Sequence, residues 1–114
     1  MKNIQSELNK LSCSACSRKT PELNYIEINR HIKNINNWQL NDDRKMIFKK
    51  IIFKNFKQSL EFTNLIGQLA ESEGHHPDIS IGWGYCLILI HTHAIKGLSM
   101  NDFILASKID NLTL

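Results

Sequence analysis

Four of the five histidines lie between positions 75 and 93, and they form two pairs. His75 and His76 are adjacent and are followed by Pro77, whereas His91 and His93 are two residues apart at the end of an apolar run. Imidazole has its ordinary pKa near neutrality, so two imidazoles that face one substrate can act as acid and base at the same pH. The pattern predicts a small pocket for proton transfer, formed by the turn that carries the first pair and the strand end that carries the second.

A zinc site is the chemical alternative, because four histidines could in principle supply its ligands. Neither pair has the i, i+4 spacing of a helical zinc motif, and adjacent histidines rarely share one ion. The region also offers few obvious carboxylates that could orient metal-bound histidines. We therefore predict no metal and no cofactor.

Two of the three cysteines form the motif Cys13-x-x-Cys16, which is half of a zinc knuckle or a redox pair. No second such motif follows, and no strand is predicted before it, so we interpret it as part of a mobile segment. Residues 1–20 are polar and lack a sustained period, which predicts a flexible N-terminal segment ahead of one domain over residues 21–114. Cys86 lies in a predicted strand and is expected in the core.

Three helices are predicted, each from a capping residue that precedes apolar side chains at helical spacing. Two of the starts are capping boxes, in which the carboxylate three residues on reaches back to the cap. Gly74 stands where a helix needs a left-handed residue at its end, and Pro77 forbids continuation. The caps are Asn24 with Glu27, Asn55, and Ser99 with Asp102, and the helices cover about 24–36, 56–73 and 99–110.

Four strands are predicted between these helices, from alternating or continuous apolar residues bounded by turn signals. They cover 38–40, 45–53, 79–81 and 85–93, and Asn41-Asp42-Asp43 joins the first two as a hairpin. The order is helix, two strands, helix, two strands, helix. It predicts an α+β fold, a four-stranded, mainly antiparallel sheet with three helices packed on one face.

Length and composition limit the classes of protein that fit. A chain of 114 residues makes about one domain. Its net charge of +3 is spread along the chain, which does not indicate a nucleic-acid-binding surface. No run of 18 apolar residues is present, and the first residues lack the apolar stretch of a secretion signal. With three cysteines as well, we expect a cytoplasmic protein with reduced thiols and no contact with membranes.

The motifs around the histidines resemble the bacterial branch of the pterin-4a-carbinolamine dehydratase family. The resemblance rests on Glu71-x-x-Gly74-His75-His76-Pro77, then Thr92-His93, then Gly97-Leu98-Ser99-x-x-Asp102. It extends over about residues 13–110, including Phe53-Lys54-Asn55-Phe56, Trp83-Gly84 and the early cysteine motif. It implies a hydro-lyase that removes water from a 4a-hydroxytetrahydropterin and yields the quinonoid dihydropterin. It also implies a four-stranded antiparallel sheet with three helices, and no metal or other cofactor.

The same resemblance implies roles for individual residues. His75 and His93 are the acid/base candidates, with the direction of transfer left open, and His76 completes the catalytic set by binding and orienting the pterin. Two carboxylates are less specific: Glu71 is either a pocket residue or a helix-surface residue, and Asp102 either contacts the site or only caps its helix. The residues expected to line the ring are His75, His76, Pro77, Thr92, His93, Ala94 and Ile95, with Glu71 and Asp102 beside them.

Partners are predicted on two grounds. The family implies recycling of the pterin cofactor of an aromatic amino acid hydroxylase, and therefore a functional link to phenylalanine hydroxylase. Leu87 and Leu89 are expected on the face of the strand that carries His91 and His93, where they are too apolar for open solvent, so we expect a homodimer or homotetramer. The alternative function is a non-catalytic or dual-role protein-binding module of the same fold.

Overall fold

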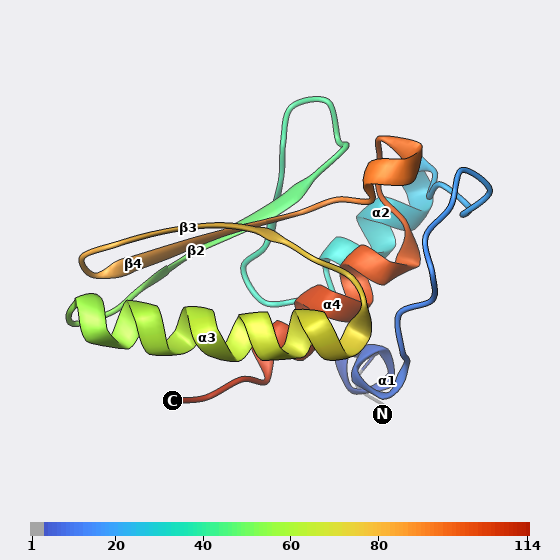
Figure 1. The fold of residues 1–114 in the computed structure, drawn as a ribbon. Coiled ribbons are helices and arrows are strands. Elements are labelled where there is room, and N and C mark those ends of the chain that lie inside the picture. Colours follow the sequence, from blue (N-terminus) through green and yellow to red (C-terminus); the bar gives the residue numbers. More distant parts are fainter. Residues whose placement is uncertain (1–3) are drawn as a thin grey trace.

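A four-stranded sheet and four α-helices form the fold in the computed structural model, which describes the backbone of residues 4–114 and the side chains from Glu7 onward (Figure 1). A short 3-10 helix, η1, follows the last strand. The helices are α1 (Ile4–Lys10), α2 (Tyr25–Ile32), α3 (Phe56–Glu73), η1 (His93–Ile95) and α4 (Met100–Asp110). The strands are β1 (Gln39–Leu40), β2 (Ile47–Ile52), β3 (Asp78–Gly82) and β4 (Tyr85–Ile90).

The sheet is antiparallel throughout, with the strand order β1-β2-β4-β3. Side chains alternate along β4, so Cys86, Ile88 and Ile90 are fully buried while Tyr85, Leu87 and Leu89 are only partly covered. Figure 1 shows α3 running along one face of the sheet, with α4 beside it. The predicted α+β architecture, with its three main helices and four-stranded antiparallel sheet, is confirmed.

Helix α3 has the predicted bounds, because both of its ends carry a specific signal. The Asn55 side chain accepts a hydrogen bond from the backbone N–H of Gln58, which satisfies one of the free donors of the first turn. At the other end Gly74 has a φ of 66°, the left-handed conformation that glycine adopts without a side-chain clash. This reversal sends the chain directly into the histidine pair.

Helix α4 lies inside the molecule, in contact with α1 and α3. All residues from Asn101 to Ala106 are buried, and Phe103 and Leu105 have no exposed surface. Burial of a large apolar side chain stabilises a fold by roughly 1.5–3 kcal/mol. The first turn of this helix is therefore held in place by the core itself.

Two differences from the prediction affect the site. Residues 4–10 form a helix, α1, where none was predicted, and its Leu8 is buried against the core. The last strand was predicted to reach His93 but ends at Ile90, because its partners end there: Ile47 pairs with Ile90, and Asp78 pairs with Leu89. Beyond that point Thr92 pairs with Gly97 across a short loop, and η1 fills the loop.

In the part of the chain that the structure describes, none of the helices combines the length and the apolar character needed to cross a bilayer.

Candidate active site

His75 is held in a buried position directly after the left-handed turn at Gly74. Its backbone N–H donates to the carbonyl of Ala70, and its side chain is almost completely buried. The ring Nε2 lies 2.6 Å from Oδ1 of Asp102, in the first turn of α4. An ionised carboxylate can only accept hydrogen bonds, so beside one the neutral form of this ring would carry its proton on Nε2 and its lone pair on Nδ1.

Asp102 connects the histidine to the start of α4. Its Oδ2 accepts from the backbone N–H of Ser99 and from Oγ1 of Thr92, both at 2.8 Å, and the Thr92 and Ser99 hydroxyls are 2.7 Å apart. The Asp102 and Thr92 side chains have no exposed surface. The carboxylate thus caps the helix, as one sequence interpretation expected, and also fixes the ring of His75. A buried charge is stable only when it is compensated in this way.

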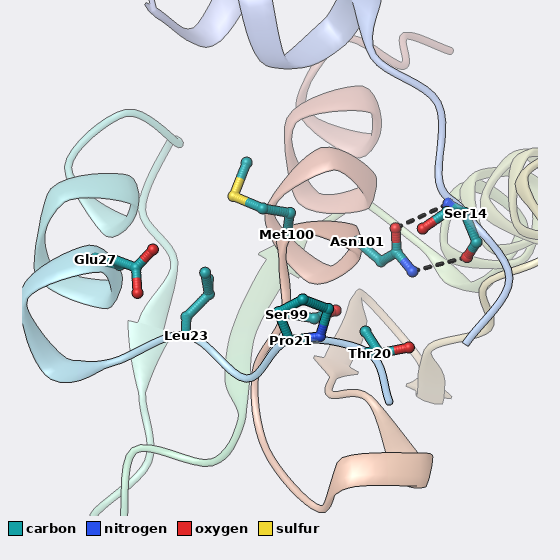
Figure 2. Close-up of a pocket in the computed structure, with 8 residues that line it drawn as sticks. All are labelled: Ser14, Thr20, Pro21, Leu23, Glu27, Ser99, Met100 and Asn101. Carbon is teal, nitrogen blue, oxygen red and sulfur yellow. Dashed lines mark hydrogen bonds between the residues drawn. The ribbon is translucent and has the colours of Figure 1, made fainter. Parts of the chain in front are cut away.

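Cys16 lies on the other nitrogen of the same ring. Its Sγ is 3.6 Å from Nδ1 of His75 and accepts a hydrogen bond of 3.2 Å from Nδ2 of Asn101. The Asn101 side chain also makes two hydrogen bonds to the backbone of Ser14 (Figure 2). Its Oδ1 accepts from the Ser14 N–H at 3.0 Å, and its Nδ2 donates to the Ser14 carbonyl at 2.8 Å. The segment around residues 14–16 is therefore attached to the helix that carries Asp102. The sequence interpretation left Cys16 outside the site, although the resemblance around the cysteine motif was a signal for it.

Cys13, the other cysteine of the motif, has a different environment. Burial and the nearby Glu73 carboxylate raise the pKa of its thiol to about 12, so it stays protonated near neutral pH. Its backbone N–H donates to Oε1 of Glu73 and its Sγ is 3.5 Å from the carbonyl oxygen of Asn101. Thiolates are the form that binds zinc and exchanges disulfides. This environment therefore argues against a function of Cys13-x-x-Cys16 as a thiolate pair.

A cavity of about 260 Å³ brings residues from three parts of the chain together. Cys16 comes from the N-terminal segment, the first histidine pair from the turn after α3, and His93 from η1. This volume lies near the lower end of the about 300–1,000 Å³ usual for small-molecule sites, so it suits a compact ligand. The lining residues are Cys16, Gly74, His75, His76, His93 and Ala94.

The other predicted site residues lie near this cavity but do not line it. Nε2 of His76 is hydrogen-bonded to Oε2 of Glu71, and both side chains are largely exposed, so the pair can adjust to a ligand. Thr92 donates a hydrogen bond to Asp102, which in turn contacts His75. Pro77 and Ile95 flank residues that do line it. The structure thus brings His75, His76, His93 and Ala94 to one cavity and leaves Glu71, Pro77, Thr92, Ile95 and Asp102 around it.

A second cavity, of about 320 Å³, lies between the N-terminal segment and the start of α4 (Figure 2). Of the eight described residues that line it, Glu27 is the one with an ionisable side chain, and its carboxylate already accepts from the backbone N–H of Asn24 in the capping box of α2. Proton transfer needs a group that can change its protonation state in contact with the ligand. The histidine cavity is therefore the better candidate for chemistry.

The cavity is equipped for acid/base chemistry on a small molecule. The Nε2 hydrogen bond to Asp102 leaves Nδ1 as the ring nitrogen of His75 that can take up a proton, and the adjacent carboxylate would stabilise the cation that forms. His76 and His93 are exposed and can reorient toward a bound ligand.

Comparison with known proteins identifies one family. The sequence profile described as "Pterin 4 alpha carbinolamine dehydratase" matches residues 21–112. A protein of Methylococcus capsulatus, named as a candidate pterin-4-alpha-carbinolamine dehydratase, is 42% identical over 100 residues, which cover 88% of each chain. A protein of Alkaliphilus metalliredigens with the same name is 44% identical over 106 residues, which cover 92% of this chain and 95% of the relative.

Solved structures show the same fold. A protein of Brucella melitensis, described as a "transcriptional coactivator/pterin dehydratase", has a TM-score of 0.74 and 26% identity, and the match covers 78% of this chain and 95% of that one. A pterin dehydratase-like protein described as a RuBisCO assembly factor of the alpha-carboxysome has a TM-score of 0.56 at 24% identity, with coverage of 66% and 87%. The second similarity is one of fold alone.

Proposed function

The chain belongs to the pterin-4α-carbinolamine dehydratase family, and we propose that it is an active hydro-lyase that dehydrates 4a-hydroxytetrahydropterins by histidine acid/base catalysis. The observation that carries the proposal is the shared cavity. His75, His76 and His93 line it together, and the ring of His75 is fixed by a buried carboxylate. A protein that only bound a partner would not need this arrangement.

The reaction requires two proton transfers. The hydroxyl on C4a leaves poorly as hydroxide, so a donor must protonate its oxygen, and the C4a–O bond then breaks to release water. The proton on N5 must pass to an acceptor as the C4a–N5 double bond forms. One proton is gained and one is lost, so no oxidant or reductant is consumed. A positioned side chain contributes about 10²–10⁴-fold to each such transfer.

His75 and His93 are the proposed partners in these transfers. The neutral ring of His75 can accept at Nδ1, because its Nε2–H is already donated to Asp102. His93 is the exposed imidazole that would serve the complementary step. His76, hydrogen-bonded to Glu71, is proposed to bind and orient the ring system, with the backbone of Thr92 to Ile95 and Pro77 beside it.

The test is stopped-flow measurement of the decay of 4a-hydroxytetrahydropterin absorbance. The wild-type protein should accelerate the decay over buffer, and a His75→Ala, His93→Ala double variant should lose about 10²-fold or more of that acceleration. A His91→Gln variant is the matched histidine control, because His91 is outside the lining of the cavity, and it should keep the wild-type rate. If the pterin absorbance decays at the buffer rate with wild type as well as with the double variant, the protein is not a dehydratase.

Two partner relations are proposed, the first from the reaction and the second from an exposed surface. The product is a quinonoid dihydropterin, so the enzyme would serve an aromatic amino acid hydroxylase, such as phenylalanine hydroxylase. The face of the sheet away from α3 exposes apolar surface, including Ile52 at 70% exposure with Leu87 and Leu89 partly covered. We propose that this surface is covered in a homodimer or homotetramer, which sedimentation equilibrium would detect.

A protein-binding role is the second candidate, as an addition to catalysis or in its place. It is favoured by the exposed sheet face and by the similarity to the Brucella protein, which is described as a transcriptional coactivator as well as a dehydratase. The stopped-flow pterin assay distinguishes the two candidate functions. A purely binding module would leave the pterin decay at the buffer rate, whereas a dual-role protein would catalyse it.

A further inference from the structure

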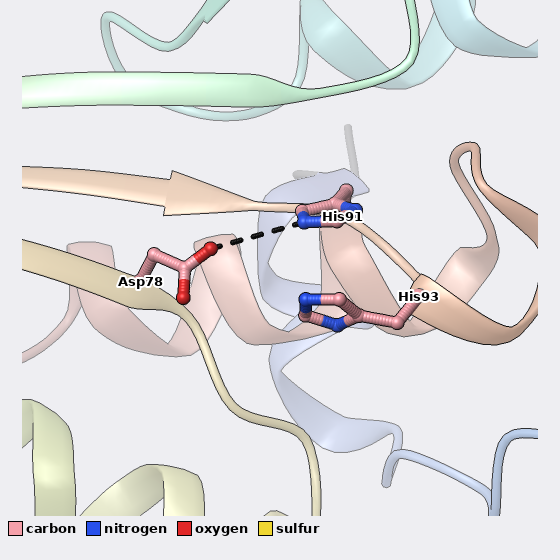
Figure 3. Close-up of side chains that lie close together, drawn as sticks. All are labelled: Asp78, His91 and His93. Atoms are coloured by element: carbon pink, nitrogen blue, oxygen red, sulfur yellow. Dashed lines mark ion pairs between the residues drawn. The ribbon is translucent and has the colours of Figure 1, made fainter.

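Three side chains at the end of the sheet place possible metal ligands close together, beside the histidine cavity. They are Asp78, His91 and His93, and one donor atom from each lies within 4.8 Å of the other two. Figure 3 shows the two imidazoles side by side, with nitrogens directed toward the Asp78 carboxylate. This convergence was not predicted, since the sequence interpretation saw few carboxylates near the histidines.

The backbone explains the convergence. Asp78 begins β3 and pairs with Leu89 of β4, so it lies level with the end of that strand. His91 follows β4 directly, and His93 begins η1, where the chain turns back. The two rings have their centroids 4.0 Å apart at an angle of 48°, and Nε2 of His91 is 3.8 Å from Oδ2 of Asp78. The three ligands thus come from the start of β3, the residue after β4 and the start of η1.

We propose that Asp78, His91 and His93 form a binding site for one divalent transition-metal ion of the Zn²⁺ type. Two imidazole nitrogens and one carboxylate oxygen are a common protein ligand set for zinc, and they leave a fourth position open. Magnesium and calcium prefer oxygen ligands throughout, so they fit this set poorly. Metal–ligand bonds of 2.0–2.2 Å require donor atoms roughly 3.3–3.6 Å apart. Asp78 and His93 are exposed, so they can move the short distance inward that this needs.

The contacts among the three side chains are too weak to be a structural reason for their arrangement. The His91–Asp78 pair is 3.8 Å long and the Asp78 side chain is 66% exposed, and ion pairs of this type contribute little to stability.

The cysteine motif is the alternative place for a metal ion, with Cys13 and Cys16 as ligands. Burial and the Glu73 carboxylate keep the Cys13 thiol protonated, which disfavours them.

The site has a consequence that rests on the proposed function. His93 belongs both to this cluster and to the lining of the cavity. An imidazole with one nitrogen bound to an ion keeps a proton on the other nitrogen, so the ring can no longer alternate between the neutral and protonated forms that acid/base catalysis needs. A bound transition metal should therefore inhibit the dehydratase, and the inhibition should depend on His91 and Asp78, which are not in the cavity lining.

The first experiment measures binding alone, by isothermal titration of the tag-free protein with Zn²⁺ and by the absorbance of bound Co²⁺. Wild type should bind one ion per chain, and His91→Ala and Asp78→Asn should each bind more weakly. The loss of one ligand should exceed the about 10- to 100-fold effect of losing an outer-shell partner. The matched control is His76→Ala, which removes a histidine outside the cluster and should leave the affinity unchanged. A Cys13→Ser, Cys16→Ser double variant should also bind as wild type does.

Three results would overturn the site: no binding of Zn²⁺ by wild type, equal affinity in wild type and His91→Ala, or loss of binding in the double cysteine variant alone. The second experiment adds Zn²⁺ to the pterin assay, where inhibition of wild type but not of His91→Ala is expected. A protein that binds zinc at this cluster but never accelerates the pterin decay would refute the proposed function and leave the site intact. An active enzyme that binds no zinc would refute the site and leave the proposed function intact.

Discussion

Replacement of Asp102 by asparagine tests whether the buried carboxylate positions His75. The side chain keeps its shape, but one carboxylate oxygen is replaced by an N–H₂ group, which donates hydrogen bonds and does not accept them. The amide oxygen can still accept from Thr92 and Ser99, while the amide N–H₂ must then face Nε2 of His75. Two donors would meet, so the ring proton should move to Nδ1. The lone pair needed in the cavity would be lost.

The size of both effects can be estimated from the contacts. A hydrogen bond to a charged group contributes about 1.5–3 kcal/mol and a neutral one about 0.5–1.5 kcal/mol. Two of the three bonds to Asp102 become neutral and the third is rearranged, so we expect a loss of about 2–4 kcal/mol of unfolding free energy. A domain with about 5–15 kcal/mol of stability still folds after this loss. With the wrong tautomer, kcat should fall by about 10²-fold or more, and KM should change less.

The control is Asp110→Asn, at the other end of the same helix. That carboxylate is also buried, and it pairs with Lys49 at 2.8 Å and accepts from Nε1 of Trp38 at 2.9 Å. The Asp110→Asn variant should lose a similar amount of unfolding free energy, measured by urea unfolding, while its kcat stays near that of wild type. The ¹⁵N shifts of the His75 ring report the tautomer directly. If Asp102→Asn keeps the proton on Nε2, or keeps kcat within threefold of Asp110→Asn, the positioning role is refuted.

Two further predictions concern stability. Burial lowers the pKa of His31, which packs against Phe103 with ring centroids 5.4 Å apart, so the unfolded chain binds a proton more readily than the folded one. Unfolding free energy should therefore fall as pH decreases below about 6.5, the ordinary pKa of histidine, and His31→Phe should flatten this decrease in urea titrations; an unchanged pH dependence would contradict the assignment. Gly67→Ala should raise Tm, because Gly67 lies inside α3, and Gly74→Ala should lower it, because Gly74 has a φ of 66°. Neither new methyl group meets a neighbour, so the backbone effect alone is compared. Each shift should correspond to about 1 kcal/mol, and a rise in Tm for Gly74→Ala would show that the left-handed turn is not required.

Much of the fold could be predicted, because its main signals are local. The cap at Asn55 and the left-handed Gly74 define α3 from residues within one turn of each end. The capping pair Ser99 and Asp102 likewise marks the start of α4. Helix α1 was missed because it is short and its Leu8 is stabilised by residues far away in the sequence. Tertiary packing of this kind leaves no periodic pattern to read.

The candidate site was predicted only where local motifs indicate it, because its other contacts are between residues far apart in the sequence. His75, His76 and His93 could be grouped from their motifs, but the sequence does not show what lies on each ring nitrogen. Cys16 reaches His75 across 59 positions, and it does so because Asn101 holds the segment that carries the cysteine. The end of β4 at Ile90 depends on where its neighbours stop, which single-strand patterns do not reveal. These contacts are long-range, and they decide the chemistry of the cavity.

The burial of α4 implies that the two sides of the cavity differ in how readily they open. Asp102 lies in a helix whose next four residues are buried, so its contact with His75 should persist until the whole domain unfolds, and its amide should be among the slowest to exchange with deuterium. Cys16 is exposed, and side-chain bonds to Asn101 connect its segment to the helix. We therefore expect that segment to detach locally at a smaller free-energy cost than global unfolding. The hydrogen-bonded pair of His75 and Asp102 would then remain assembled while the opposite wall of the cavity opens to let a ligand enter and leave.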